Sequence, residues 1–235
     1  MGSHLAGLAA GEGPSRGHRT LAEKAFDTLH TAIITGQLRP GTRLPIEELA
    51  DLLEMSPMPI REAVRRLDAA GLVENIPHRG ARVTELSVTD LTEVYEARIA
   101  LELPAIRRAA ERFTAEHEAE ARRRLRALHE ADEESFAAAS EAHTRFHFAL
   151  YAAAGSAWLM RLILPVWETS ERYSLEVPDV RRLPHRQSEH QEMLDACVAH
   201  EPERAAAVLH SHMAVTANRI AEAMGGEALF TLSGA

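Results

Sequence analysis

Apolar and polar positions in residues 18–85 follow a pattern typical of three short helices and a strand pair. Thr20 and Glu23 form a capping box that predicts the start of the first helix. Apolar residues at helical spacing predict a second helix over residues 46–53 and a third over residues 59–71. The tight turn between the last two helices is typical of a helix-turn-helix.

Two short apolar runs, residues 72–76 and 81–86, flank a turn and predict a β-hairpin, the wing of a winged helix-turn-helix. On the third predicted helix, Arg61 and Arg65 lie one turn apart on a flank that the apolar stripe leaves free, whereas Arg66 points to another side. Guanidinium groups bind phosphates or a guanine edge. The candidate DNA contacts from this pattern are Arg61, Arg65, Arg79 and Arg82.

From Val88 onward the pattern is helical throughout, with breaks near residues 114–115, 155–156, 176–180 and 201–202. These breaks predict about six helices packed as an all-α antiparallel bundle. The expected fold is therefore mainly α, with an N-terminal winged helix-turn-helix followed by the bundle. The expected divisions are a tag-like or disordered tail over residues 1–17, a DNA-binding domain over 18–86, and a ligand-binding and dimerisation domain over 87–235.

Charge is divided unevenly between the two predicted domains of this 235-residue chain, whose formal net charge is −9. Residues 18–85 hold 9 Lys and Arg against 10 Asp and Glu, whereas residues 86–235 hold 16 against 24. The acidic second domain would repel DNA, which confines DNA contacts to the first domain. No apolar run is long enough for a membrane span and no signal segment opens the chain, so we expect a cytoplasmic protein. The single cysteine, Cys197, lies among apolar residues and is interpreted as buried filler.

Four histidines of the second domain have spacings that favour a metal site. His143 and His147 are four residues apart on one predicted helix, so their side chains lie on one face. His190 lies ten residues before the end of one helix and His212 ten residues after the start of the next, which places them at the same height in an antiparallel pair. Four imidazoles suit zinc, nickel, cobalt or copper better than magnesium or calcium.

Chance alone gives a histidine-rich chain some pairs at helical spacing. For His117, His129, His185 and His200 we therefore prefer the interpretation of an exposed or hydrogen-bonded side chain. His210 is two residues from His212 and lies on the opposite side of its helix, so it cannot share the site.

The first domain resembles the DNA-binding domain of the GntR family over nearly all of residues 20–85. The resemblance implies a dimeric regulator on a short palindromic operator, with the third helix in the major groove and the wing tip, around Gly80, at the minor groove. It adds Arg43 to the candidate DNA contacts. The family usually has arginine and threonine, which touch base and phosphate, where this chain has Pro57 and Met58. The matching residues are Leu44, Pro45, Glu48, Leu49, Ala50, Ser56, residues 59–67, Gly71, Leu72, Val73 and Gly80.

The second domain resembles the FCD effector domain of the FadR subfamily within the GntR family, over about residues 88–225. Metal-binding members place an aspartate four residues before the histidine of a Phe-His pair and add two histidines from the last helices. Here that aspartate position holds His143, which either coordinates as a nitrogen ligand or stands aside. The resemblance implies a divalent transition metal, zinc with nickel as an alternative, and a small organic acid as effector. The matching residues are Asp90, Tyr95, Glu96, Arg98, Leu101, Glu102, Phe146, His147, His190 and His212.

Arg98 has two interpretations. In similar proteins the arginine at this place often faces the cavity, where its guanidinium would bind a carboxylate; alternatively, Arg98 forms a surface ion pair with Glu102 one turn away. For the whole chain we expect a regulator, not an enzyme, whose operator affinity responds to the bound acid. The alternatives are a regulator that senses the metal itself and, fitting less well, a metal-dependent hydrolase, because no general base is evident beside the histidines.

Overall fold

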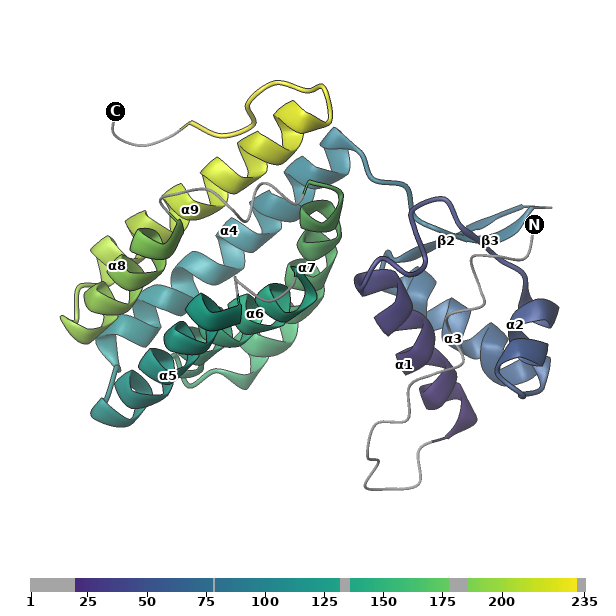
Figure 1. Ribbon diagram of the computed structural model, residues 1–235, viewed down its shortest axis with the longest axis horizontal. Coiled ribbons are helices and arrows are strands. Elements are labelled where there is room, and N and C mark those ends of the chain that lie inside the picture. The colour runs from purple at the N-terminus through teal and green to yellow at the C-terminus, as the bar shows by residue number, and fades with distance from the viewer. Residues whose placement is uncertain (1–19, 78, 132–135, 178–185, 232–235) are drawn as a thin grey trace. The chain divides into compact units, whose positions relative to one another are not determined.

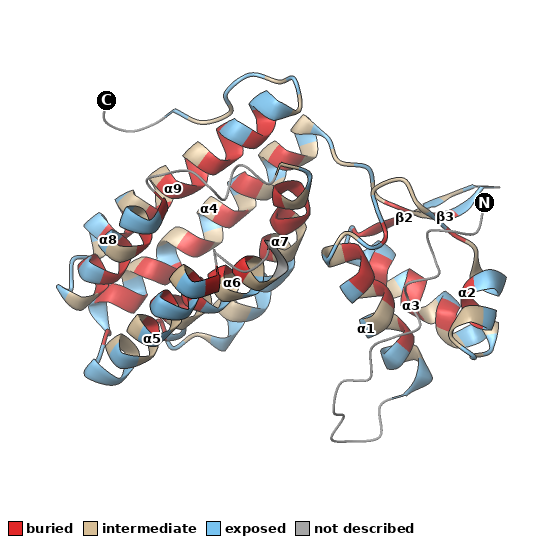
Figure 2. Ribbon diagram, in the orientation of Figure 1, coloured by how far each residue is buried: buried red, intermediate tan, exposed pale blue. Residues whose placement is uncertain are grey.

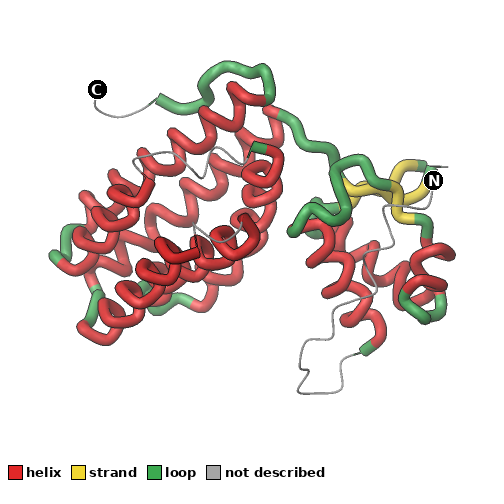
Figure 3. The backbone as a smooth tube through the Cα atoms, viewed as in Figure 1, coloured by secondary structure: helices red, strands yellow, loops and turns green. Residues whose placement is uncertain are grey.

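The computed structural model describes residues 20–77, 79–131, 136–177 and 186–231. The chain divides into two compact units, with the boundary between Leu86 and Ser87. Helices dominate both units, and a small sheet belongs to the first (Figure 3). The expected tail, residues 1–17, lies outside the described part of the chain.

The first unit combines three helices with a small antiparallel sheet (Figure 1). The strand order of this sheet is β1-β3-β2. Its core is apolar and is formed by inward-facing residues of all three helices together with residues of the sheet. This arrangement confirms the winged helix-turn-helix. The elements are α1 (Leu21–Ile34), β1 (Arg43–Leu44), α2 (Ile46–Leu52), α3 (Pro57–Ala69), β2 (Val73–Ile76) and β3 (Gly80–Val83).

Helix α1 begins as the capping box predicts. The Thr20 hydroxyl accepts from the Glu23 backbone N–H at 3.2 Å, and the Glu23 carboxylate accepts from the Thr20 N–H at 2.8 Å. Gly36 follows the helix with φ of 75°, a backbone conformation in which glycine is unstrained. The helix therefore ends at Ile34, just before the turn that Gly36 forms.

Two details of the first unit differ from the sequence-based expectation. Helix α3 begins at Pro57, two residues before the expected start at Pro59. The first turn of a helix tolerates proline because its backbone N–H groups have no partner within the helix. The sheet also has a third strand, β1, which is too short at two residues to show an alternating pattern.

The second unit is a bundle of six helices among its described residues, as the breaks in the pattern predict. Helix α4 lies along α9 and also contacts α7, while α5 packs on α6 and α8 on α9. Buried residues follow the inward faces of these helices (Figure 2). No described helix is long and apolar enough to cross a membrane. The elements are α4 (Val88–Glu111), α5 (Ala115–Ala131), α6 (Phe136–Ala152), α7 (Ala157–Glu176), α8 (Arg186–Val198) and α9 (Pro202–Ala223).

Candidate DNA-binding surface and metal centre

Helix α3 buries its apolar stripe and exposes the two arginines predicted to contact DNA. The side chains of Arg61 and Arg65 are 60% and 72% exposed. Arg61 forms an ion pair with Glu47 of α2 at 3.2 Å, and Arg65 forms one with Glu62 at 2.7 Å. Ion pairs this exposed contribute little to stability, so both guanidinium groups can exchange their carboxylates for DNA.

The wing brings two further candidates side by side. Arg82 of β3 lies opposite Arg43 of β1 on one side and opposite Glu74 of β2 on the other. Its guanidinium binds Glu74 at 2.6 Å. Arg79 is exposed in the turn before β3, and the adjacent Gly80 has φ of 78°.

Arg66 lies on another side of α3, as the helical spacing predicts. Its guanidinium carbon is 4.1 Å from the ring centroid of Phe26 on α1. Pro57 and Met58 occupy the first turn of α3, and Met58 is 73% exposed. An apolar side chain thus stands at the helix start, where the resemblance to the GntR family implies a polar one.

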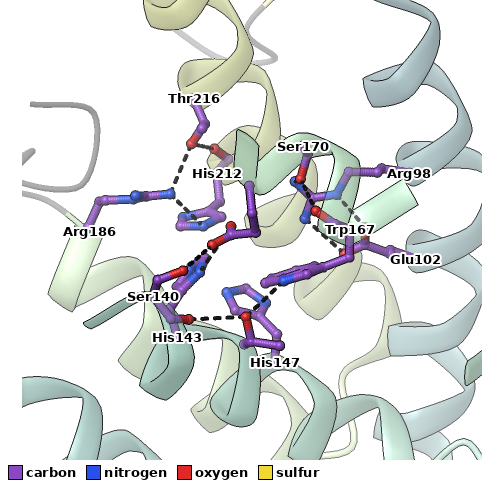
Figure 4. A network of polar contacts seen from close by, with 12 residues as sticks. Arg98, Glu102, Ser140, His143, His147, Trp167, Ser170, Arg186, His212 and Thr216 are labelled. Atoms are coloured by element: carbon purple, nitrogen blue, oxygen red, sulfur yellow. Dashed lines mark hydrogen bonds and ion pairs between the residues drawn. The ribbon is translucent and has the colours of Figure 1, made fainter. Parts of the chain in front are cut away.

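Four histidines from three helices of the bundle meet in its interior. His143 and His147 come from α6, His190 from α8 and His212 from α9, and all four are buried. Each offers one nitrogen to a group whose members all lie within 4.8 Å of one another. Figure 4 shows three of these residues, His143, His147 and His212, pointing toward one another. The cluster could hold a metal ion.

The ring positions agree with the spacing argument. The centroids of His143 and His147 are 4.6 Å apart, as expected for residues one turn apart on a shared helical face. Those of His190 and His212 are 4.9 Å apart across α8 and α9, so the two residues face each other as predicted. His143, for which the family resemblance implies an aspartate, lies within the cluster and not beside it.

Hydrogen bonds fix the outer edges of two of the rings. Nδ1 of His212 lies 2.7 Å from a carboxylate oxygen of Glu189, and Nδ1 of His147 lies 3.3 Å from the hydroxyl of Tyr151. Nε2 of His147 is buried and has no hydrogen-bond partner among the described residues. Metal-binding histidines commonly have this arrangement, with one nitrogen held by a neighbour and the other directed at the ion.

Burial also keeps His147 in the neutral form that a metal requires. Loss of solvent lowers the pKa of His147 well below its usual range, and positive charge on His190 or His212 would lower it further. A neutral imidazole offers a lone pair without first losing a proton, so the chemistry of this residue fits a transition metal.

Arg98 and Glu102 form the predicted ion pair, at 2.7 Å, but the pair is buried and not on the surface. Arg98 also donates to the Ser170 hydroxyl at 3.0 Å, and its guanidinium carbon lies 4.4 Å from the Trp167 ring. Glu102 accepts from the Tyr151 hydroxyl at 2.6 Å. Burial is the largest influence on the pKa of Arg98 and lowers it, yet the attractions of Glu102, Tyr95 and Tyr151 together with the hydrogen bond to Glu102 outweigh burial, and the pKa is raised.

A narrow pocket adjoins the histidine cluster and shares His143 and His212 with it. The pocket is lined by the buried carboxylate of Glu171 and by the buried guanidinium groups of Arg98 and Arg186. Arg186, at the start of α8, donates to Nε2 of His212 at 3.3 Å and to the Thr216 hydroxyl at 3.1 Å (Figure 4). The lining residues are Tyr95, Arg98, His143, Glu171, Ser174, Arg186, His212, Met213 and Thr216.

The structure adds residues that sequence spacing did not single out. Carboxylates do lie beside the histidines: Glu189 binds His212, and Glu171 lies 4.0 Å from Nδ1 of His143. Arg186 is four residues before His190, which places both on one face of α8. This four-residue spacing could have predicted that Arg186 lies near the cluster. Glu171 is on α7, which carries none of the four histidines, so no spacing along the sequence could have predicted its place.

The other described histidines lie outside the cluster. His117 contacts Thr114 at the start of α5, and His200 contacts the Ala110 carbonyl at 2.8 Å. His210 and His129 are not in the cluster either. His185 lies outside the described residues.

Comparison with known proteins identifies the family. Residues 21–83 match the bacterial regulatory proteins of the gntR family, and residues 93–215 match the FCD domain. The chain belongs to the GntR family. It is thus a DNA-binding transcriptional regulator of the GntR/FCD type, as the sequence resemblance predicts.

Two similar regulators and one solved structure cover most of this GntR chain. An uncharacterized HTH-type transcriptional regulator of Paraburkholderia xenovorans, BphR, is 32% identical, over 91% of this chain and 90% of its own. A probable D-xylose utilization operon transcriptional repressor of Paenarthrobacter nicotinovorans is 34% identical, over 88% and 92%. The Escherichia coli McbR/YncC structure has a TM-score of 0.71 at 27% identity, covering 83% of this chain and 94% of that one. These relatives are regulators, not enzymes, so they do not support the hydrolase hypothesis.

Proposed function

We propose that this GntR regulator binds a palindromic operator as a homodimer, and that a small organic acid held beside a divalent transition metal in the FCD domain controls its DNA affinity. The main observation is the buried four-histidine cluster, which shares two residues with a pocket that buried arginines line. Ligand binding there would shift the spacing of two DNA-binding units and so couple the two sites.

On DNA, α3 would lie in the major groove, with Arg61 and Arg65 at base edges or phosphates. Their exposure and weak ion pairs support this role. The wing residues Arg79, Gly80 and Arg82, together with Arg43 beside Arg82, would contact the backbone and the minor groove. One small unit covers few base pairs, so a two-fold dimer on a palindrome follows.

In the bundle, His143, His147, His190 and His212 would hold the metal. Zinc suits four neutral nitrogen donors, and nickel is the alternative. Zn–N bonds of about 2.0–2.1 Å place tetrahedral ligands about 3.3 Å apart, so the nitrogens, now within 4.8 Å, would draw inward on binding. A bound divalent metal with an open position would supply a Lewis-acid site for a carboxylate oxygen. Four histidine ligands fill a tetrahedral shell, so acid binding requires a fifth position or the departure of His143.

The closed shell favours a second candidate, a regulator that senses the metal itself. If metal is the signal, operator affinity follows the free metal concentration in the absence of any organic acid. If the acid is the signal, operator affinity changes with the acid while the metal stays bound. Operator binding measured across a metal titration, with and without a panel of short carboxylates, separates these two regulators.

Elemental analysis of the purified protein tests the metal site. We expect close to one zinc or nickel per chain in the wild type, and loss of that metal in both His147→Ala and His212→Ala. His210→Ala is the matched control, because His210 lies two residues from His212 on the same helix and outside the cluster. Stoichiometric metal that survives both cluster substitutions would refute the site.

A further inference from the structure

We infer that Arg186 leaves His212 when that histidine coordinates a metal, and that its guanidinium then becomes the carboxylate-binding cation of the adjoining pocket. The inference rests on the proposed metal site and assigns the effector-binding role to Arg186 instead of Arg98. It makes carboxylate affinity depend on metal occupancy through one side chain.

The first step concerns the tautomer of His212. Its Nδ1 lies 2.7 Å from a Glu189 carboxylate oxygen, which can only accept when ionised, so Nδ1 bears the hydrogen. In the neutral ring, Nε2 then has the lone pair. This is the nitrogen that a metal would use, because a carboxylate holds the other one.

The second step is competition for that lone pair. Arg186 Nη2 lies 3.3 Å from Nε2 of His212, and a guanidinium can only donate. One lone pair cannot accept from Arg186 and also bind a metal. A guanidinium does not deprotonate in proteins, so its positive charge opposes a divalent cation at this distance. Arg186 must therefore move away from Nε2 when a metal binds.

The third step is where the guanidinium goes. Arg186 also donates to the Thr216 hydroxyl at 3.1 Å, a contact that can persist while the other is lost. Arg186 is 7% exposed and lines the pocket, so a released N–H group stays away from bulk water. A buried cationic donor is stabilised by an acceptor with negative charge, which a carboxylate ligand supplies.

Arg98 suits this role less well. Its Nε and Nη2 both donate to Glu102, so the edge that would bind a carboxylate in a two-pronged way is occupied. Its Nη1 donates to Ser170, and the negative charge of Glu102 balances its own. Nη2 of Arg186, by contrast, donates to the His212 ring and to the Thr216 hydroxyl, and metal binding at His212 would release the first of these contacts.

The direction in which zinc affinity changes when Arg186 is replaced tests the inference. Competition with a chelator measures this affinity. Removing a competing charged donor in Arg186→Met should tighten zinc binding by about tenfold or more. Arg186→Lys, which keeps the charge but has a different reach, should give a smaller change. Arg145→Met is the control for loss of one arginine, because Arg145 lies exposed on α6, and it should leave zinc affinity unchanged. Zinc binding that is unchanged or weaker in Arg186→Met would overturn the inference.

Linkage with a carboxylate gives a second measurement. In the wild type, sodium acetate at millimolar concentration should tighten zinc binding relative to chloride at equal ionic strength, and Arg186→Met should abolish this effect. Equal linkage in both proteins would also overturn the inference.

A crystal structure of the zinc-loaded wild type tests the movement of Arg186 without depending on whether a variant folds. Arg186 Nη2 should lie beyond hydrogen-bond distance of Nε2 of His212, and retention of the 3.3 Å contact beside bound zinc would contradict the proposed movement. If the wild type binds no metal at all, the proposed metal site fails together with the inference. If the wild type binds zinc but Arg186 stays in place, only the inference fails.

Discussion

The two units of this regulator use arginine in opposite ways. In the DNA-binding unit, Arg61 and Arg65 are largely exposed and each pairs with a glutamate at the surface. In the FCD unit, Arg98 is 6% exposed and its partner Glu102 is fully buried. An exposed pair can exchange its carboxylate for phosphate at little cost, whereas breaking a buried pair leaves an uncompensated charge out of water.

This difference teaches which functions can be altered without altering the fold. Substitutions on the outer face of α3 should change DNA binding and leave stability nearly intact. Substitutions around the histidine cluster should change both, because the cluster is joined through Tyr151 to the buried pair of Arg98 and Glu102. Four experiments measure how far the contrast holds.

The largest contrast is expected in thiol reactivity. Burial raises the pKa of the Cys197 thiol to about 12, against a usual value of 9.0, so its reactive thiolate should be about a thousandfold scarcer than in an exposed cysteine. Ellman's reagent at pH 8 should leave native Cys197 unmodified over a time in which the urea-unfolded chain reacts fully. Because the thiolate fraction rises with pH, any native reaction should accelerate about tenfold per pH unit below 12.

Met58→Cys in a Cys197→Ser background is the matched comparison for thiol reactivity. Met58 is 73% exposed, so a thiol there should react at the rate of a free peptide. Equal reaction rates of the Cys197 thiol and of the thiol introduced at position 58 would mean that burial in the bundle does not protect Cys197 from the reagent.

Loss of the buried carboxylate should have the next largest effect. Glu102→Gln leaves Arg98 charged, buried and without its carboxylate, which should lower the free energy of unfolding by about 3–5 kcal/mol. Urea denaturation of the metal-free protein measures this change. A loss below about 1 kcal/mol would show that the pair is not isolated from water.

Glu203→Gln is the control for Glu102→Gln. It breaks the ion pair of Glu203 with Arg107 between α9 and α4, where the Glu203 side chain is 79% exposed. The expected change in the free energy of unfolding is about 0–1 kcal/mol. Because both variants replace glutamate by glutamine in an ion pair with arginine, the difference between their free energies of unfolding reports the effect of burial.

Removal of one DNA-contacting guanidinium should have an intermediate effect. Arg61→Ala should weaken specific operator binding about ten- to a hundredfold, without a measurable change in thermal stability. Arg145→Ala removes the same charge from the FCD unit, where Arg145 is exposed, and serves as the control in the same fluorescence anisotropy assay. If both variants weaken operator binding equally, Arg61 contributes only through the net charge of the protein and does not contact a base.

The contrast between the units also explains what the sequence could predict. Elements of the first unit are marked by local signals: a capping box at Thr20, a glycine at the end of α1 and an apolar stripe in α3. Its arginines face solvent because the stripe faces inward, which periodicity alone determines. Strand β1 lacks such a signal, since its two residues are defined by pairing with β3.

In the bundle, spacing predicted contacts within helices and across one hairpin. The pairing of His143 with His147 follows from one helical turn, and that of His190 with His212 from the symmetry of the hairpin. The approach of Glu171 from α7 depends on how that helix packs against α6, and side-chain periodicity holds no information on such packing. The burial of Arg98 is unpredictable for the same reason, since Trp167 and Ser170 of α7 cover it.

The smallest effect is expected at the start of α3, where the family resemblance implies a polar residue and this chain has Met58. Met58 is exposed in the first turn of the helix that would enter the major groove. Met58→Thr adds a hydroxyl that can donate to a phosphate, a contact worth about 0.5–1.5 kcal/mol, so we expect operator affinity to rise about two- to tenfold at most. Met58→Val, which has nearly the shape of threonine without the hydroxyl, is the control. Because a phosphate contact is independent of sequence, Met58→Thr should strengthen binding to operator and scrambled duplexes alike, as anisotropy titrations can measure. A gain confined to the operator would instead mean that residue 58 lies at a base edge, and that the surface of α3 used for specificity extends one turn beyond Arg61.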